Sequence, residues 1–306
     1  MQSRVPCLVV GMLSLLLSNL AGAQDYLWKE IVIEGATVDQ AFGLNDKGQI
    51  AVSTTVGSGI YENGTLTRLP PLKGFAVLAL GINNDGVITG GAFTVAGTQG
   101  FILRGSTYTL FSRPGWDNTV PRAIANSGLI TGENFSTDLR TFAGFIYDPD
   151  TDTFTDATPP GSIETLTQGM NKFGRITGHG REPGIPVGGR YGFVWQQGAI
   201  TKGKRDLLPF LDRINIDVNT YARGINDSGL VVGFIRDAAL RGDGFVGSDA
   251  GGYQRLVAPG GEMPGNSTFC SGINNLAQVV CYVWDQTSNP LGAFIGSPPK
   301  GGGDER

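Results

Sequence analysis

Short apolar runs alternate with polar turns along almost the whole chain. The turns share the pattern Asn-x-x-Gly, which follows an aliphatic residue and precedes a run such as Leu-Val-Val-Gly at 230–233. The pattern occurs at 45–48, 83–86, 125–128, 171–174, 226–229 and 274–277, with Ala125 replacing the first Asn and Ala277 replacing the last Gly. Repeats of about 40 to 50 residues are typical of proteins built from copies of one small unit. The sequence therefore predicts six copies of one module.

Each module reads as a series of short antiparallel strands. An Asn that opens a turn bonds its own backbone, and Gly at the fourth position adopts positive φ without steric cost, so the repeated turn predicts a hairpin. A third strand is expected around a Phe that forms the core of its module. These positions are Phe101, Phe145, Phe193, Phe245 and Phe294. A fourth strand then leads to a Pro or Gly stop, as at 65–70.

Four short strands at this period predict the blades of a β-propeller. The sixth module ends after its third strand, at 294–296, whereas a spare strand at 26–33 precedes the first turn. A closed ring uses both ends if the N-terminal strand completes the last blade. We therefore predict an all-β propeller of six blades, each of four antiparallel strands, with the N-terminal strand closing the last blade. A β-solenoid and an irregular sandwich are the alternatives.

The two ends of the chain are expected to lie outside this domain. Residues 1–23 combine Arg4, an apolar run and the segment Ala-Gly-Ala at 21–23, which is typical of a signal peptide cleaved before Gln24. The alternative is a retained anchor helix. No later segment is apolar for the roughly 18 residues of a membrane span, so the mature chain is expected to have no transmembrane segment. We predict a signal peptide at 1–23, one repeat domain at 24–297 and a disordered tail at 298–306.

Charge argues against nucleic acid as a partner. Cleavage of the leader removes Arg4 and leaves 22 basic and 27 acidic residues, a net charge of −5. Proteins that bind phosphate backbones normally carry a basic balance or a basic stripe. Together with the leader, this charge indicates a secreted or periplasmic protein that binds no nucleic acid.

The repeat resembles a known family. The pattern Gly-Ile-Asn-x-x-Gly-x-Val-Val-Gly, followed by Ala or Gly and then Phe, looks like the HAF repeats of bacterial proteins described as probable extracellular repeat proteins. The resemblance runs from about Ala41 to Ile295, although the His of the family's triplet is absent from every module. It implies an exported bacterial β-rich repeat protein and supplies no catalytic residues.

Two cysteines, Cys270 and Cys281, remain after the predicted cleavage. Counting outward from the turn at 274–277 pairs Ile273 with Gln278 and, in the same register, Cys270 with Cys281. Opposed residues of antiparallel strands lie about 4.5 to 5.5 Å apart between Cα atoms, which suits a disulfide. Export places the pair in an oxidising compartment, so we predict this disulfide. The alternative is a metal pair, but the only histidine, His179, lies in another module.

The sequence offers little catalytic chemistry. Calcium needs six to eight oxygens, whereas each turn holds at most one Asp, so the Asn and Asp residues are better interpreted as turn formers. His179 has no Gly-x-Ser-x-Gly elbow beside it and is expected at a surface turn. Four carboxylates are candidates for a glycosidase pair across a propeller mouth: Asp117, Glu133, Glu164 and Asp243. We predict no catalytic residue, cofactor or metal, and we do not expect an enzyme.

The extra length of the fourth module lies at 199–219. A basic edge stands there beside an apolar cluster, and insertions on repeat scaffolds often lie on the functional face. We take four residues as a candidate partner surface: Lys204, Arg205, Phe210 and Leu211. The alternative is a loop that folds back on the rim of the ring.

The predicted function is an exported binding or scaffolding module whose partner is a protein or an extracellular carbohydrate. The alternative is a propeller enzyme, hydrolase or lyase-like, that acts on extracellular polysaccharide. Two carboxylates about 5 to 10 Å apart at the central mouth favour the enzyme, and a mouth without such a pair favours binding.

Overall fold

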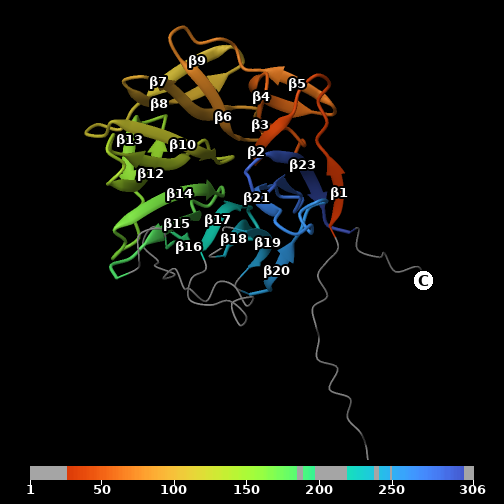
Figure 1. The fold of residues 1–306 in the computed structure, drawn as a ribbon. Coiled ribbons are helices and arrows are strands. Elements are labelled where there is room, and N and C mark those ends of the chain that lie inside the picture. The colour runs from red at the N-terminus through yellow and green to blue at the C-terminus, as the bar shows by residue number, and fades with distance from the viewer. Residues whose placement is uncertain (1–25, 185–188, 197–218, 238–240, 249, 300–306) are drawn as a thin grey trace, which may run out of the picture.

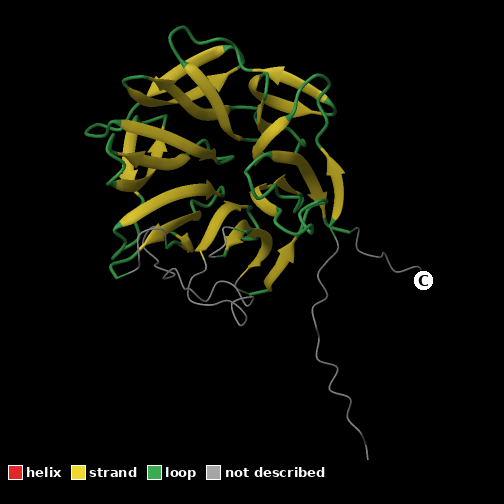
Figure 2. Cartoon of the chain, in the orientation of Figure 1, coloured by secondary structure: helices red, strands yellow, loops and turns green. Residues whose placement is uncertain are grey.

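The computed structural model describes residues 26–184, 189–196, 219–237, 241–248 and 250–299. The predicted signal peptide, residues 300–306 of the predicted tail, and Lys204, Arg205, Phe210 and Leu211 of the candidate partner surface lie outside the described residues. All regular structure in the described ranges is strand (Figure 2). The strands form sheets that stand around a common centre, a propeller-like arrangement (Figure 1).

The sheets follow one another around the ring in chain order (Figure 1). The first contains β2 (Val38–Leu44), β3 (Ile50–Thr54), β4 (Gly57–Glu62) and β5 (Thr65–Arg68). The next contains β6 (Ala76–Ile82), β7 (Ile88–Thr94), β8 (Gly97–Arg104), β9 (Thr107–Phe111), β10 (Asn118–Ile124), β11 (Ile130–Phe135), β12 (Phe142–Asp148) and β13 (Thr153–Asp156).

Three smaller sheets complete the circle. One contains β14 (Glu164–Met170), β15 (Ile176–Arg181) and β16 (Tyr191–Trp195), and the next contains β17 (Asn219–Ile225), β18 (Val231–Arg236), β19 (Gly242–Ser248) and β20 (Gly252–Leu256). The last contains β21 (Ser267–Ile273), β22 (Val279–Trp284), β23 (Pro290–Ser297) and β1 (Leu27–Glu30). The innermost strands β2, β6, β10, β14, β17 and β21 each pack on the next, and β21 packs on β2.

The N-terminal strand closes the last sheet, as predicted. β1 pairs antiparallel with β23, so that Leu27 faces Ser297 and Glu30 faces Phe294. Residues from the two ends of the folded domain therefore share one ladder of hydrogen bonds. The ring cannot open at this sheet without breaking that ladder.

The sheets differ from the prediction in two places, once in their number and once in the number of strands. β6 to β13 form one eight-stranded sheet, because β8 and β10 meet in parallel at the single pair Thr98 and Asn118. The Asn118 side chain strengthens this contact, since its Oδ1 accepts a hydrogen bond from the backbone N–H of Thr98 at 3.0 Å. The sheet of β14 to β16 has three strands in the described residues.

The repeated Phe forms the core of its module, as predicted. Its side chain is buried at all five positions, Phe101, Phe145, Phe193, Phe245 and Phe294. The residue opposite on the neighbouring strand is glycine in four modules and Cys281 in the last. Because glycine has no side chain, the Phe ring lies over the backbone of that strand, within 3.0 Å of where a Cβ atom would stand.

The Asn that opens each turn bonds in two directions. Its Oδ1 accepts from its own turn, as Asn45 does from the N–H groups of Lys47 (3.1 Å) and Gln49 (3.0 Å). Its Nδ2 donates to the backbone carbonyl of the equivalent residue in the next module. These bonds run from Asn45 to Asn83 (2.9 Å), Asn83 to Ala125 (3.5 Å), Asn171 to Asn226 (3.2 Å), Asn226 to Asn274 (3.1 Å) and Asn274 to Asn45 (3.1 Å). The turns therefore hold neighbouring modules together.

A second set of bonds runs beside the first. The backbone N–H of the next turn residue donates to the side-chain oxygen at the equivalent position of the following module. The bonds run from residue 46 to Asn84, 84 to Asn126, 172 to Asp227 and 227 to Asn275 at 2.9 Å, and from 275 to Asp46 at 2.7 Å. Both sets are interrupted at one junction, because Ala125 has no amide to reach Asn171 and Lys172 has no oxygen for the N–H of Asn126.

We expect Ala125→Asn to raise the free energy of unfolding by about 1 kcal/mol, the usual net value of a buried hydrogen bond. The new side chain takes the slot that the other five turns fill with Asn, and its amide reaches the carbonyl of Asn171. Urea denaturation of the variant and the wild type measures the difference. Ala125→Asp is the matched control, since it accepts the same turn bonds but has no N–H for Asn171. Equal stability of the Asn and Asp variants contradicts the prediction.

Candidate functional site

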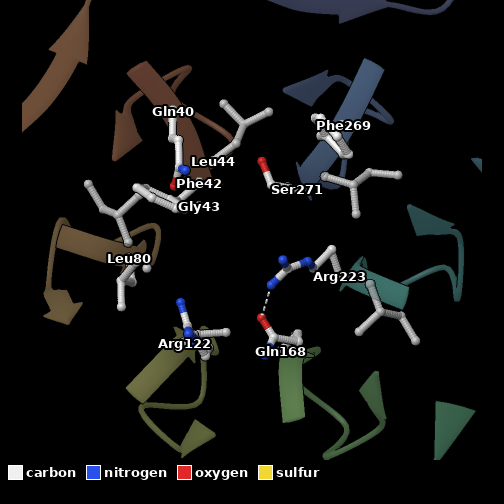
Figure 3. Close-up of a pocket in the computed structure, with 18 of the residues that line it drawn as sticks. Gln40, Phe42, Gly43, Leu44, Leu80, Arg122, Gln168, Arg223, Phe269 and Ser271 are labelled. Atoms are coloured by element: carbon white, nitrogen blue, oxygen red, sulfur yellow. Dashed lines mark hydrogen bonds between the residues drawn. The ribbon is translucent and has the colours of Figure 1, made fainter. Parts of the chain in front are cut away.

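Each innermost strand carries one irregular residue that lies at the central cavity. In five strands the register shifts by one residue just before the Gly or Ala that precedes the repeated turn. The residues at these bulges are Leu80, Arg122, Gln168, Arg223 and Ser271, and Phe42 lies in the corresponding irregular stretch of β2. A bulge leaves its extra residue without a ladder partner and re-aims the side chain. All six residues line the cavity, around which Figure 3 shows them.

The glycines that follow the bulges let the inner strands come close together. A Cβ atom on Gly272 would stand 2.3 Å from the carbonyl oxygen of Phe42, and one on Gly43 would stand 2.9 Å from the Cα of Gly81. The residues that follow these glycines form a ring of large apolar side chains: Leu44, Ile82, Ile124, Met170, Ile225 and Ile273. These side chains line both the cavity and a smaller space of about 60 Å³ at the repeated turns. The cavity therefore ends at an apolar ring.

The cavity is cationic on one side. Its volume is about 290 Å³, and its lining includes three arginines, Arg122, Arg223 and Arg236, and two glutamines, Gln40 and Gln168. None of the described residues that line it is Asp or Glu. Guanidinium groups stay charged at all ordinary pH values and present several N–H donors in one plane. Such a lining attracts an anion.

A chain of hydrogen bonds holds two of these arginines, Arg122 and Arg223, in place. The buried Glu133 accepts from Arg122 Nη2 at 2.5 Å and Nε at 3.1 Å, and from Gln168 Nε2 at 2.7 Å. Arg223 Nη1 in turn donates to Gln168 Oε1, the bond drawn in Figure 3. One carboxylate therefore supports two guanidinium groups, which leaves an excess of positive charge beside the cavity.

Aromatic side chains form the wall beside these charges. Phe234, Phe269, Tyr282 and Trp284 line the cavity and pack on one another, with ring centroids 4.9 to 5.7 Å apart. The guanidinium of Arg223 lies 5.3 Å from the centroid of Phe234, and that of Arg236 lies 5.7 Å from the centroid of Phe269. Burial raises the pKa of Tyr282, and the guanidinium groups of Arg223, Arg122 and Arg236 act in the opposite direction. Tyr282 is therefore a neutral hydroxyl at pH 7.

On the opposite arc of the cavity the bulge positions are apolar, Phe42 and Leu80, and the polar Gln40 lies beside Phe42 (Figure 3). A molecule that fits this cavity carries negative charge on one side and an apolar face on the other. The lining combines a few polar groups with aromatic and aliphatic walls, as small-molecule sites generally do.

None of the four candidate carboxylates lines the cavity, and each has partners of its own. Glu133 supports Arg122, and the buried Glu164 accepts from Arg181 at 3.1 Å and Arg190 at 2.6 Å. The exposed Asp117 accepts from the backbone N–H of Thr137 at 2.8 Å. Asp243 pairs with Arg255 at 2.7 Å. Among the described residues, the lining therefore does not contain the carboxylate pair that glycoside hydrolysis needs.

His179 is buried, so its expected place at a surface turn is wrong. β15 continues through His179 to Arg181, because Arg181 still pairs with Glu164 on β14. The His179 ring meets the ring of Tyr221 edge to face at 4.8 Å, and its Nδ1 has no partner among the described residues. Burial lowers the pKa of His179 well below its usual value, and the charges of Arg223, Arg190 and Arg122 lower it further. His179 is therefore a neutral part of the core at pH 7.

This burial predicts acid sensitivity. The unfolded chain binds a proton at His179 near pH 6.5, and the folded protein does not. The contribution of His179 to the free energy of unfolding is therefore fully present above pH 6.5 and falls as the pH drops below it. We expect His179→Phe to flatten the stability curve between pH 6.5 and 5 by as much as about 1.4 kcal/mol per pH unit. Chemical denaturation at several pH values measures the slopes. Parallel slopes for the variant and wild type contradict the prediction.

The predicted disulfide is present. Cys270 on β21 and Cys281 on β22 are bonded, with Cα atoms 4.0 Å apart. The register next to the turn is not the one predicted, since Ile273 faces Val279 and not Gln278. The bulge at Ser271 shifts the register by one residue and brings Cys270 opposite Cys281. The described residues contain no group of three or more His, Cys, Asp or Glu placed to hold a metal ion.

Similarity to known proteins shows the fold. No protein-family model and no curated protein matches the chain in sequence. A protein assigned provisionally as a gluconolactonase has a solved structure that superposes with a TM-score of 0.53 at 10% identity over 90% of this chain and 92% of its own. A gluconolactonase from Xanthomonas campestris superposes with a TM-score of 0.52 at 13% identity over 91% and 92%. The chain is an all-β propeller. At such identities the likeness extends to the fold and not to the activity.

Proposed function

We propose that the protein binds a small anionic ligand in its central cavity. The observation that carries this proposal is the cavity lining, in which Arg122, Arg223 and Arg236 face a space that no described carboxylate lines. The volume of about 290 Å³ lies near the lower end of the roughly 300 to 1,000 Å³ of small-molecule sites. A carboxylated monosaccharide fits this chemistry, because its charge meets a guanidinium and the C–H face of its ring packs on an aromatic wall.

The test is binding of galacturonate, with galactose as the uncharged match. Calorimetry on the mature protein is expected to show binding of galacturonate and at least tenfold weaker binding of galactose, because charge-assisted hydrogen bonds to arginine contribute about 1.5 to 3 kcal/mol. Arg223→Gln is expected to weaken the binding of galacturonate by tenfold or more. Arg255→Gln, which changes an arginine outside the cavity, serves as the control. Equal affinity for the two sugars, or no effect of Arg223→Gln, counts against the proposal.

A propeller hydrolase or lyase is the alternative function. Nothing in the cavity lining favours the hydrolase, since the candidate carboxylates Asp117, Glu133, Glu164 and Asp243 do not line it. Incubation of the protein with an α-1,4-linked oligogalacturonate, followed by chromatography, tests for turnover, and shorter products that accumulate with time favour the enzyme.

We also propose that the protein is exported and that it is related to the HAF repeat proteins. The disulfide Cys270–Cys281 supports an oxidising compartment, secreted or periplasmic, because such bonds are rare in the cytosol. No helix among the described residues has the length and apolar character to cross a membrane. The relation to HAF repeat proteins stays a prediction based on the repeated turn.

We also propose that the ring is best counted as six blades. The eight-stranded sheet then divides into β6–β9 and β10–β13, which are joined by the single pair of Thr98 and Asn118. What supports this count is that each half has its own repeated turn and its own innermost strand, as the other sheets do. An experimental structure of the mature protein tests the count.

A further inference from the structure

A second cavity adjoins the central one on the side of the last sheet. Its volume is about 400 Å³, larger than that of the central cavity. The residues around it are mostly polar: Arg236, Arg241, Gly265, Ser267, Phe269, Trp284, Asp285, Gln286 and Ser288. It lies between the end of β18 and Arg241 on one side and β21, the end of β22 and the turn after β22 on the other. We call this space the side groove.

Three residues line both the central cavity and the side groove: Arg236, Phe269 and Trp284. Trp284 is half-buried, and its orientation is fixed, because its Nε1 donates to the carbonyl of Asp39 at 3.1 Å and its ring meets that of Phe269 edge to face. A rigid indole at the junction offers one flat surface to a molecule that extends from the one space into the other.

The side groove differs from the central cavity in charge. Arg241 lies at it and pairs with Asp237 at 2.8 Å, and the carboxylate of Asp285 accepts from the N–H groups of Thr287 and Asn289 in its own turn. Those donors, together with the side chains of Thr287 and Asn289, lower the pKa of Asp285 to about 2. The groove is therefore polar and nearly balanced in charge, with hydrogen-bonding groups beside an aromatic surface.

We propose that the ligand is an acidic oligosaccharide of at least two sugar units, with one carboxylated unit in the central cavity and the next in the side groove. This inference rests on the proposed function and adds the length of the ligand. A second sugar suits the groove because its hydroxyls meet Arg241, Gln286 and Ser288 while a ring face packs on Trp284. The aromatic junction favours a sugar over an acidic peptide, whose backbone offers no flat apolar face.

The experiment compares galacturonate with its α-1,4-linked dimer by calorimetry on the mature protein. We expect the dimer to bind about tenfold more tightly than the monomer, because the second unit fills the groove. Arg241→Gln is expected to lower the affinity for the dimer by about threefold or more and to leave the affinity for the monomer unchanged. The matched control is Arg255→Gln, since both arginines are exposed and both pair with one Asp, at 2.8 and 2.7 Å, but only Arg241 lines the groove.

The outcomes separate the two proposals. Binding of the monomer with no gain for the dimer overturns the two-unit ligand and leaves the central site intact. If Arg241→Gln and Arg255→Gln lower the affinity for the dimer equally, the second sugar unit does not bind in the side groove. A Glu-Glu dipeptide that binds as tightly as the dimer overturns the assignment to a sugar. If neither uronate binds, the proposed function fails as well.

Discussion

Gly233→Ala is expected to lower the free energy of unfolding by about 3 kcal/mol, at the upper end of the usual cost of overpacking a core. A Cβ atom at this position would stand 2.0 Å from the carbonyl oxygen of Tyr221 and 2.7 Å from Cζ of Phe245. The carbonyl belongs to β17, so the strand itself must move to relieve the clash. Thermal and urea denaturation of the variant measure the loss, which for a domain of this size corresponds to a fall in Tm of about 6 to 12 °C.

Gly64→Ala is the matched control. Gly64 has a φ of +89° in a hairpin turn, and a Cβ atom there would meet nothing within 4 Å. Its replacement strains the backbone only, at a cost of about 1 kcal/mol. Gly233 is not among the glycines with positive φ. A loss at Gly64 as large as that at Gly233 therefore means that the contacts of Gly233 with Tyr221 and Phe245 cost no more than a strained turn, which contradicts the prediction.

Removing the disulfide is the second change with a large expected effect. The bond closes a loop with a sequence separation of 11 residues, and in the chain-entropy model its loss costs about 3 kcal/mol. We expect the double variant Cys270→Ala with Cys281→Ala to unfold about 6 to 12 °C below the oxidised wild type. Both side chains are fully buried between strands of the last sheet, so the loss also leaves a small cavity.

A reductant separates the bond from the packing. Dithiothreitol is expected to lower the Tm of the wild type towards that of the double variant and to leave the variant unchanged. Thiol counting by mass spectrometry confirms that the bond is reduced in each sample. A wild type that keeps its Tm once both thiols are free shows that the bond adds no stability.

Much of the fold was predictable because its signals are local. The Asn at the start of the turn and the Gly at its end act within four residues, and the backbone bond from Gly86 to Asn83 has a close equivalent in every module. The Phe strands and the N-terminal strand β1 also lie where they were expected. The eight-stranded sheet was not expected, because the contact of Thr98 with Asn118 joins two modules and no repeat of the sequence signals it.

The candidate site was missed for a related reason. The residue three places before the start of each repeated turn varies in chemical type from module to module, which makes Arg122 and Arg223 look like ordinary strand residues. The signal that points to them is this variable position inside an otherwise regular repeat. This signal has a meaning only once the bulge is known. Without the shift of register, Arg122 and Arg223 have partners on the neighbouring strand and their side chains do not turn towards the cavity.

His179 illustrates the same limit. Glycines flank it on both sides, and the sequence therefore suggested a turn at the end of a strand. The strand instead continues, and the ring of Tyr221 from the next sheet covers the imidazole. Burial of a residue by a neighbouring module depends on contacts between segments far apart in the chain, which periodicity does not encode.

Local sequence signals were enough to predict the repeated turns, the order of strands in the described modules, the Phe core and the pairing of Cys270 with Cys281. These follow from backbone preferences and side-chain periodicity over a few residues. Which side chains face the centre, and what charge they bring there, follows from the packing of the whole ring and not from any local signal. The reason is that Arg122 comes from one sheet and Arg223 and Arg236 come from another, so that the three gather only when the ring closes around the cavity.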